Sequence, residues 1–301
     1  MSARRRPGNF RFFGLYTFFV PNGAELAILT ALFIAGALLG NIVTAGITLL
    51  CGSGIAAEYG TLVAYPLMFI PAMMYASARS RTNSMNRSGL KLDSTNFGKT
   101  GGLLCALTAM VATLAAAFCG DAFSMLLPEM PAWLKEMLEG LTQGNFWINF
   151  LMVSIFAPLF EEWLCRGMVL RGMLGNGVKP WIAIILSALF FAIIHLNPWQ
   201  AIPAFMIGCL FGYVYYKTGS LRLTMLMHFT NNSFALLLGR FDVLKDADNW
   251  LDVLSRQQYF TIFAACVLLV ILAVRVFARI QCTGAAGGAA KVPCIFDEKE
   301  R

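Results

Sequence analysis

The chain contains eight apolar stretches that are long enough, or nearly long enough, to cross a lipid bilayer as helices. A transmembrane helix needs roughly 17–25 predominantly apolar residues. The stretches lie near residues 24–50, 61–78, 101–127, 145–163, 181–196, 199–216, 221–238 and 257–274. The fifth is short for a full span, so we expect it to be tilted or partly shielded by its neighbours. The sequence therefore predicts an all-α fold, a polytopic membrane bundle of about eight transmembrane helices.

The composition favours a membrane protein over a soluble domain. Hydrophobic residues make up 58% of the 301 residues and charged residues only 13%. The net charge of +7 would suit nucleic acid, but the basic residues follow the membrane topology instead. With both termini cytoplasmic, 19 of the 23 Lys and Arg residues fall on the inner side, as the positive-inside rule requires. We expect a multi-pass protein in contact with the lipid bilayer, in the plasma membrane if the chain is prokaryotic, and no nucleic-acid partner.

The same pattern divides the chain into regions. Residues 1–23 are expected to form a cytoplasmic or interfacial segment and not a cleavable signal peptide, because the next apolar stretch is far longer than a signal sequence needs. Accessory transmembrane helices are predicted over 24–127, and a catalytic core over 145–240. A C-terminal transmembrane helix is predicted over 257–280. The small, polar tail 281–301 is predicted to be disordered.

The core region carries polar and ionisable side chains that are costly inside a bilayer. Both histidines of the chain are among them. The set consists of Glu161, Glu162, Arg166, His195, His228 and Asn232. Ionisable groups at such depth are candidates for a functional site. Two carboxylates, an arginine, two imidazoles and an amide on three neighbouring stretches are typical of hydrolytic chemistry.

The spacing of the acidic pair suggests different roles for its two members. Glu162 and Arg166 are four residues apart and share a helix face, so we expect them to neutralise each other and brace the site. Glu161 is turned by about 100° from Glu162 and needs another partner, which leaves it available as a base. A second interpretation is purely structural, with both carboxylates paired to arginines, Arg166 and Arg171.

The histidines suggest how water would be used. His228 and Asn232 share a helix face, and two such donors aimed at one point stabilise the charge that develops on an oxyanion. Glu161 and His195 together can hold a water molecule and deprotonate it. Such a site attacks an amide carbonyl with water directly and forms no acyl-enzyme.

The eight cysteines do not suggest disulfides or a metal centre. They are scattered, without a CxxC pair, and most lie in apolar stretches, where cysteine behaves as a small hydrophobic residue. Cys165 lies between the acidic pair and Arg166, so a nucleophilic thiol is an alternative to water. It would need a thiolate activated by a nearby histidine, and we favour water.

These residues form three motifs, EExxxR, FxxxH and HxxxN, in this order along the chain. They read Glu161-Glu162-Trp-Leu-Cys-Arg166, Phe191-Ala-Ile-Ile-His195 and His228-Phe-Thr-Asn-Asn232. The chain thereby resembles the CAAX-processing and bacteriocin-processing (CPBP or Abi) family of intramembrane endopeptidases, which includes the Ras-converting CAAX prenyl endopeptidases. The resemblance covers roughly residues 145–240, and the first three apolar stretches match only in being hydrophobic.

The resemblance implies a role for each residue. Glu161 and His195 would activate the water, His228 and Asn232 would form the oxyanion hole, and the glutamate–arginine pair would organise the site. The neighbouring Asn231 is an alternative source of the amide. Members are often described as metalloproteases, and Glu161, His195 and His228 would then hold zinc. No HExxH pair is present, however, and water activation by glutamate and histidine needs no cofactor, so we expect none.

The sequence leaves the substrate open. The family implies either a lipidated CAAX protein or a bacteriocin or leader peptide. An alternative function is a non-proteolytic binding or self-immunity protein with the same fold. A transporter is less favoured, because its polar residues would occur in both halves of the chain. The sixth stretch carries Gly208-xxx-Gly212, and we expect this close-packing motif to hold the fifth and seventh helices in register.

Overall fold

The computed structural model describes residues 12–86, 89–136, 145–241 and 249–280. All regular secondary structure in this part of the chain is helical, which confirms the predicted all-α fold. The single helices are α1 (Gly23–Cys51), α3 (Thr61–Asn83), α4 (Gly102–Ser124), α9 (Pro180–Ile193), α10 (Pro198–Thr218), α11 (Leu221–Leu238) and α13 (Arg256–Ala278). A composite helix runs through α6 (Phe146–Asn149), η4 (Phe150–Phe156), α7 (Ala157–Glu162), η5 (Trp163–Leu170) and α8 (Arg171–Gly175). Short elements are η1 (Phe12–Tyr16), α2 (Ser53–Ile55), η2 (Ala56–Gly60), η3 (Gly98–Thr100) and η6 (Trp250–Asp252).

Each of the eight expected stretches is helical, but they differ in their capacity to cross a bilayer. Five helices are long and apolar enough by length and composition: Gly23–Cys51, Glu58–Asn83, Gly102–Phe123, Phe146–Gly175 and Arg256–Ala278. The fifth expected stretch, α9, has 14 residues, or about 21 Å at 1.5 Å per residue, less than the roughly 30 Å of hydrocarbon. Its predicted shortness is therefore confirmed. The chain is an integral membrane protein; the predicted tail 281–301 and residues 1–11 of the N-terminal segment lie outside the described residues.

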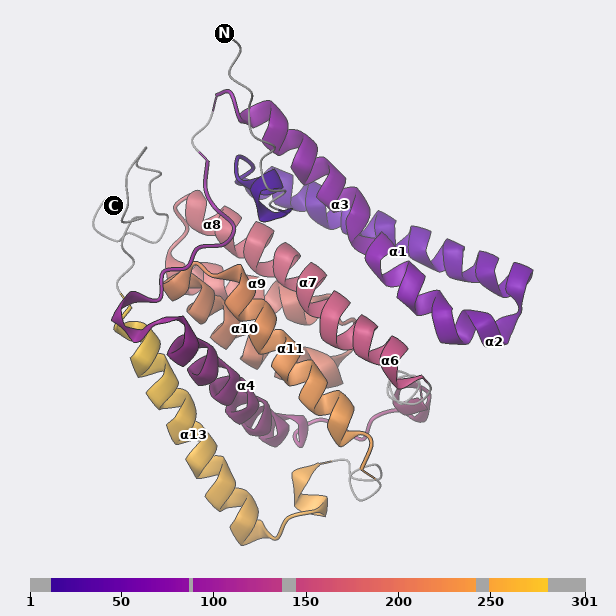
Figure 1. Ribbon diagram of the computed structural model, residues 1–301. Coiled ribbons are helices and arrows are strands. Elements are labelled where there is room, and N and C mark those ends of the chain that lie inside the picture. The colour runs from indigo at the N-terminus through magenta and orange to yellow at the C-terminus, as the bar shows by residue number, and fades with distance from the viewer. Residues whose placement is uncertain (1–11, 87–88, 137–144, 242–248, 281–301) are drawn as a thin grey trace.

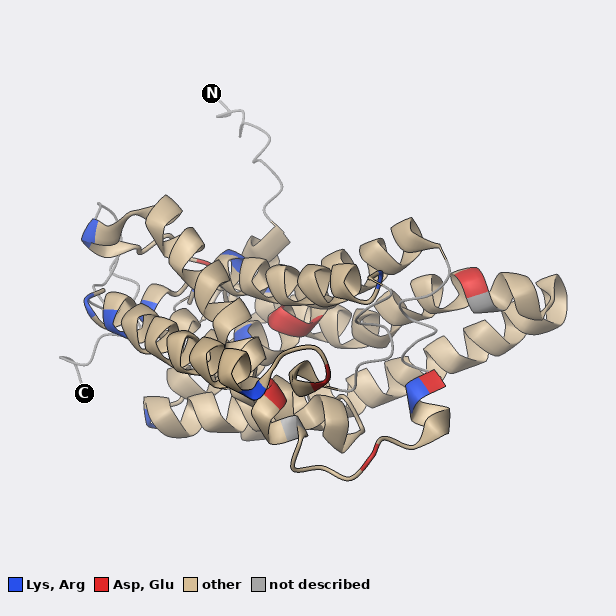
Figure 2. Cartoon of the chain, turned by 90° about the horizontal axis from the view of Figure 1, so that it is seen from below, with Lys and Arg blue, Asp and Glu red and all other residues tan. Residues whose placement is uncertain are grey.

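Helices α1 and α3 form a hairpin that lies beside the composite helix and then projects beyond the bundle (Figures 1 and 2). The two helices approach each other closely through glycine. A Cβ atom added at Gly36 would lie 2.3 Å from the carbonyl oxygen of Met68, and one at Gly40 would lie 2.9 Å from that of Ala64. Small residues allow this backbone approach in membrane helices. The register of α3 against α1 is thus fixed around residues 64–68.

The composite helix departs from regular α geometry on both sides of the acidic pair. Its segments η4 and η5 are π-helical, whereas α7 between them, which ends at Glu162, is α-helical. A π-helix forms i→i+5 hydrogen bonds and is frequent at functional sites. The two carboxylates therefore lie at the boundary between two helical geometries, a feature that the apolar pattern does not reveal.

The connection between α10 and α11 is short because one residue reverses the chain direction and the next caps the following helix. Gly219 ends α10 in the left-handed conformation, with φ 64°, and Ser220 caps α11 by accepting a hydrogen bond from the backbone N–H of Leu223. At the other end of α10, Asn197 is the N-cap. Helices α9, α10 and α11 therefore follow one another with short turns.

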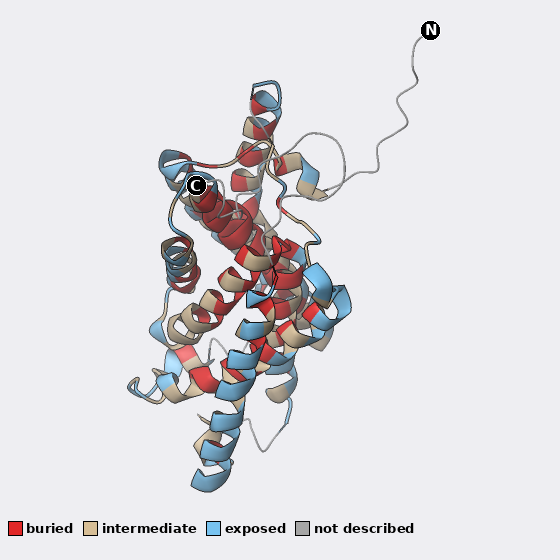
Figure 3. Ribbon diagram, turned by 90° about the vertical axis from the view of Figure 1, so that its left-hand side faces the viewer, coloured by how far each residue is buried: buried red, intermediate tan, exposed pale blue. Residues whose placement is uncertain are grey.

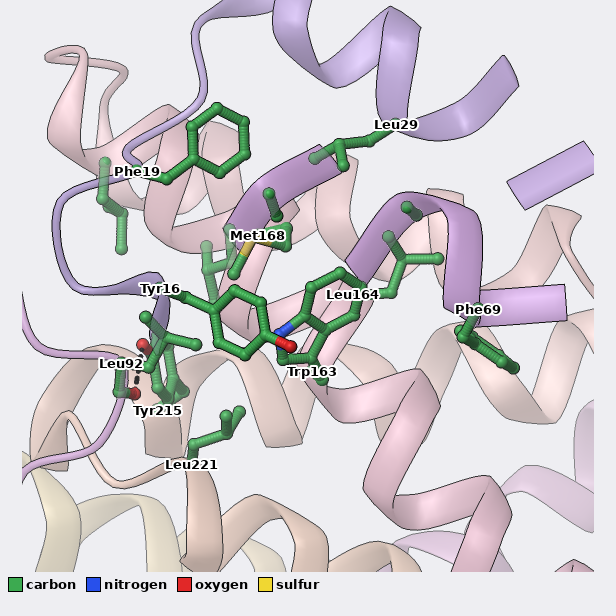
Figure 4. Close-up of a cluster of buried hydrophobic side chains, with 14 of the residues drawn as sticks. Tyr16, Phe19, Leu29, Phe69, Leu92, Trp163, Leu164, Met168, Tyr215 and Leu221 are labelled. Carbon is green, nitrogen blue, oxygen red and sulfur yellow. Dashed lines mark hydrogen bonds between the residues drawn. The ribbon is translucent and has the colours of Figure 1, made fainter. Parts of the chain in front are cut away.

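The core beside the site is aromatic and fully buried. The ring of Tyr16 packs edge-on against Trp163 at 5.3 Å, and Tyr215 donates a hydrogen bond to the carbonyl oxygen of Leu92 (Figure 4). Figure 3 shows buried residues gathered in the middle of the bundle and exposed residues on the outer helices. Lys and Arg gather toward one end of the molecule (Figure 2). The orientation of that end in the membrane stays a prediction.

The glycine motif of α10 packs against the fifth helix, as expected, whereas the expected contact with the seventh helix stays a prediction. A Cβ at Gly208 would lie 3.2 Å from the Cβ of Ala188, and one at Gly212 would lie 3.2 Å from Ile184. Both neighbours belong to α9, so α10 packs closely against the helix that leads to His195.

Candidate active site

The six polar residues of the motifs come from three parts of the bundle. Glu161 and Glu162 end α7, and Arg166 follows in η5. His195 lies in the turn that follows α9, and both His228 and Asn232 belong to α11 (helices labelled in Figure 1). The structure brings Glu161, Glu162, Arg166 and His228 into one contact network.

Glu162 and Arg166 form the ion pair that their spacing predicted. Arg166 Nη1 lies 2.7 Å from Glu162 Oε1, and both side chains are fully buried. Arg166 also donates to the carbonyl oxygen of Gly208 at 3.1 Å and lies over the ring of Phe191 at 4.6 Å. A buried ion pair needs such additional partners to offset its desolvation. The pair thus joins the composite helix to α9 and α10.

His228 lies between the two carboxylates. Its Nδ1 is 3.1 Å from Glu162 Oε1, and its Nε2 is 3.9 Å from Glu161 Oε2. A carboxylate that is ion-paired to arginine only accepts hydrogen bonds, so Nδ1 carries a hydrogen and donates it. The Nε2 edge then faces Glu161, at a separation longer than a direct hydrogen bond.

The two carboxylate oxygens of Glu161 differ in their hydrogen bonding. Oε1 accepts a hydrogen bond from the hydroxyl of Tyr65 in α3. Oε2 is buried and has no hydrogen-bond partner among the described residues. The side chain as a whole is 13% exposed, in contrast to the fully buried Glu162. Glu162 Oε2 is likewise buried without a partner among the described residues, so the two carboxylates differ in the exposure of the whole side chain and in the group that binds the other oxygen.

His195 is held at the end of α9 by hydrogen bonds of its side chain and of its backbone carbonyl oxygen. Its Nδ1 lies 2.8 Å from the carbonyl oxygen of Phe191, which can only accept, so Nε2 carries the free lone pair of the neutral ring. The ring of Phe191 packs edge-on against both imidazoles, 5.0 Å from that of His195 and 5.5 Å from that of His228. The following residue, Leu196, has φ 57°, a conformation that is costly for this residue type. Asn197 donates to the carbonyl oxygen of His195.

The two asparagines of α11 differ in what they contact. Asn232 donates from Nδ2 to the carbonyl oxygen of Val153 at 2.8 Å, which leaves its second amide hydrogen for another acceptor. Asn231 donates to Asn232 Oδ1 at 3.1 Å and also lines an apolar pocket of about 410 Å³ between α4, α11 and α13. Asn231 thus orients the Asn232 amide, whereas Asn232 faces the composite helix.

Arg171 and Cys165, which the alternative interpretations of the sequence involve, both have surroundings typical of a packing role. Arg171 does not pair with a carboxylate; its guanidinium donates to the carbonyl oxygens of Phe19, Leu90 and Gly167. The interpretation in which both acids pair with arginines is therefore wrong for Glu161. Cys165 is fully buried in a hydrophobic cluster with Phe191 and Met227, as expected of a small hydrophobic residue.

The suggested zinc ligands do not form a metal site in this structure. Over the described ranges, no three or more His, Cys, Asp or Glu side chains are arranged to hold a metal ion. Glu161 and His228 approach each other, and the Nδ1 atom of His195 bonds a backbone carbonyl, which leaves its Nε2 atom free. A catalytic zinc needs three protein ligands around one point, and Glu161, His195 and His228 do not provide them here.

Tyr65, which contacts Glu161, was not predicted from the sequence as a residue of the site. This tyrosine lies within the second apolar stretch, far along the chain from every motif, and nothing in the sequence distinguishes it from a packing residue. The one available signal is chemical, because a tyrosine hydroxyl buried in an apolar segment needs a hydrogen-bond partner.

Comparison with known proteins supports the resemblance inferred from the motifs. Residues 143–234 match the family model described as type II CAAX prenyl endopeptidase Rce1-like. The matched residues include all seven motif positions and exclude α1 and α3. No match was found among curated proteins or among solved structures. The predicted similarity to CAAX endopeptidases is confirmed for this part of the chain.

Proposed function

Since residues 143–234 are similar to Rce1-like type II CAAX prenyl endopeptidases, we propose that the protein is an intramembrane endopeptidase in which Glu161 and His195 activate a water molecule. The observation that carries this proposal is the state of Glu161. One of its oxygens is held by Tyr65, and the other is buried without a partner. Glu162 also has a buried oxygen without a partner, but its other oxygen is ion-paired to Arg166, whereas Glu161 contacts no arginine among the described residues and is 13% exposed. Buried polar atoms are nearly always hydrogen-bonded, so the unpartnered oxygen of Glu161 suits a base that binds a water.

The proposed reaction begins with a water held between Glu161 and the Nε2 lone pair of His195. Glu161 takes one proton as the water oxygen bonds to the carbonyl carbon of the scissile peptide. The carbonyl electron pair moves onto oxygen, and this oxyanion accepts a hydrogen bond from the second amide hydrogen of Asn232. His228, as an imidazolium with a hydrogen on each ring nitrogen, donates from Nε2 to the same oxygen. Glu161 then gives its proton to the departing amine as the C–N bond breaks.

The ion pair of Glu162 and Arg166 has a positioning role in this proposal. Glu162 Oε1 accepts from both Arg166 and His228 Nδ1. This hydrogen bond fixes the imidazole so that its other nitrogen faces the reacting groups, as outer partners do for many functional histidines. No step passes through a metal ion.

The substrate follows from the family and from the membrane setting. We propose a peptide or lipidated protein that reaches the site from the bilayer, of CAAX type or of the leader-peptide type. We propose a multi-pass protein with both termini cytoplasmic, and the Lys- and Arg-rich end of Figure 2 would then lie on the inner side.

The proposed function is tested by incubating the purified protein, in lipid membranes, with a lipidated CAAX peptide and with an unlipidated leader peptide. Mass spectrometry of the products identifies the bond that is cut. We expect cleavage of at least one peptide at a single bond. Absence of cleavage of both, by a protein that is folded in the same membranes, would favour a binding or self-immunity role.

A further inference from the structure

Tyr65 belongs to α3, in the part of the chain that lies outside the family match. It nevertheless contacts the central carboxylate of the site. Its hydroxyl donates to Glu161 Oε1, and its ring packs against Phe69 at 5.6 Å. Phe69 in turn stacks on Phe160, the residue that precedes Glu161. Helix α3 therefore meets the catalytic helix at the position of the proposed base, through one hydrogen bond and one aromatic stack.

The hydrogen bond divides the carboxylate into a held oxygen and a free one. Rotation about the last side-chain bond would otherwise exchange the two oxygens of Glu161. With Oε1 bound to Tyr65, Oε2 is the atom that faces His228 Nε2 at 3.9 Å and lacks a partner among the described residues. A base acts efficiently only when it is held within reach of the proton that it removes. Tyr65 supplies that restraint for Glu161.

The hairpin holds Tyr65 in turn. The close approaches of Gly40 to Ala64 and of Gly36 to Met68 lie on either side of Tyr65 in α3. Side chains at these glycines would meet backbone atoms of α3, which cannot yield as a flexible side chain can. The packing of α1 therefore sets the position of the Tyr65 hydroxyl relative to the composite helix.

We propose that Tyr65 is a positioning residue for Glu161, so that the catalytic unit of this protein includes the α1–α3 hairpin as well as residues 143–234. This inference rests on the proposed function, because it assigns Tyr65 a role in the same reaction. It also predicts that the matched region alone lacks one of the groups that orient its base.

The test compares Tyr65→Phe with Tyr75→Phe in the full-length protein. Tyr75 lies on the same helix, and its ring contacts Phe19 at 5.8 Å, away from the acidic pair. For Tyr65→Phe we expect kcat to fall by roughly 10- to 100-fold, the effect of one hydrogen bond to a charged group. We expect an unchanged KM and a protein that is still folded at the assay temperature, with a loss of unfolding free energy from the missing hydrogen bond. Tyr75→Phe should leave kcat and KM unchanged.

A second measurement needs no cleavage. The unfolding free energies of Tyr65→Phe, Glu161→Gln and the double variant form a cycle, and the two substitutions should be non-additive if their side chains interact. Non-additive stability together with no cleavage by the parent protein would overturn the proposed function, and the positioning role with it. Cleavage by the parent protein with an unchanged kcat in Tyr65→Phe would overturn the positioning role alone. A loss of kcat that only follows a loss of folded protein would also overturn it.

Discussion

At the scale of single residues, the site depends on two adjacent carboxylates that differ in exposure and in their binding partners. Each has one bound oxygen and one buried oxygen without a partner among the described residues, but Glu162 is fully buried and ion-paired to Arg166, whereas Glu161 is 13% exposed and its bound oxygen accepts from Tyr65. The difference follows from one step along the helix, which turns the two side chains by about 100°. One carboxylate is thus part of the scaffold, and its neighbour is available for proton transfer.

The buried ion pair gives a prediction about stability. Replacing Glu162 by alanine leaves the guanidinium of Arg166 buried without its counter-charge, which destabilises proteins by about 3–5 kcal/mol. The control is Arg79→Ala, because Arg79 is 40% exposed and its buried partner Glu25 keeps a hydrogen bond from the backbone N–H of Asn22, so a smaller loss of stability is expected. Unfolding in detergent measures both. Equal stabilities of the two variants would contradict this account of Glu162.

The asparagine pair gives a prediction about catalysis. Asn232→Ala removes one proposed oxyanion donor, so kcat should fall by about 10²–10³-fold without vanishing. Asn231→Ala removes only the hydrogen bond that orients Asn232 and should cost less. Steady-state cleavage rates of both variants test the assignment. A larger loss for Asn231→Ala would transfer the oxyanion role to Asn231.

The buried thiol gives a prediction about the nucleophile. Cys165→Ala removes the thiol without leaving a polar group unpaired in its hydrophobic cluster. If water is the nucleophile, the cleavage rate should stay close to that of the parent protein. A rate that falls as far as that of a Glu161 variant would instead support a thiol mechanism.

At the scale of helices, α10 determines where its neighbours lie. Its glycine motif lets α9 approach closely, and the carbonyl oxygen of Gly208 accepts a hydrogen bond from Arg166. The tight turn at Gly219 then leads into α11 and His228. One helix with few reactive groups therefore sets the positions of both histidine-bearing segments.

This packing predicts the effect of larger side chains. Gly208→Leu would force atoms into Ala188 and Phe191 and should destabilise the protein by about 1–3 kcal/mol, the usual effect of overpacking. The control is Gly46→Leu in α1, where an added Cβ meets nothing within 4 Å. Thermal unfolding in the same detergent compares them. If Gly208→Leu unfolds at the temperature of the parent protein, α10 does not have this role.

At the scale of the whole molecule, apolar length predicted the helices better than it predicted the contacts between them. Eight apolar stretches were sufficient for the all-α bundle, and the four-residue spacing of Glu162 and Arg166 was sufficient for their ion pair. The partner of Glu161 was not predictable, because Tyr65 is distant in sequence and only the packing of α3 against the composite helix brings it near. The π-helical segments were also missed, since hydrophobic periodicity does not distinguish them from α-helix.

The protein as a whole combines a matched core with a hairpin that the family comparison does not cover. The distal part of that hairpin exposes large apolar side chains, Leu49 at 86% and Leu50 at 88%, which suits contact with lipid. The proximal part reaches Glu161 through Tyr65. The same pair of helices therefore presents apolar side chains for contact with lipid at one end and contacts Glu161 at the other.

The central claim is that Glu161 and His195 activate water for peptide hydrolysis. Its most direct test is the cleavage rate of Glu161→Ala and of His195→Ala, each in membranes, with Glu58→Ala as the control because Glu58 is an exposed carboxylate outside the site. We expect both site variants to remain folded and to lose cleavage, and the control to keep the parent rate. Cleavage retained by folded Glu161→Ala would contradict the account.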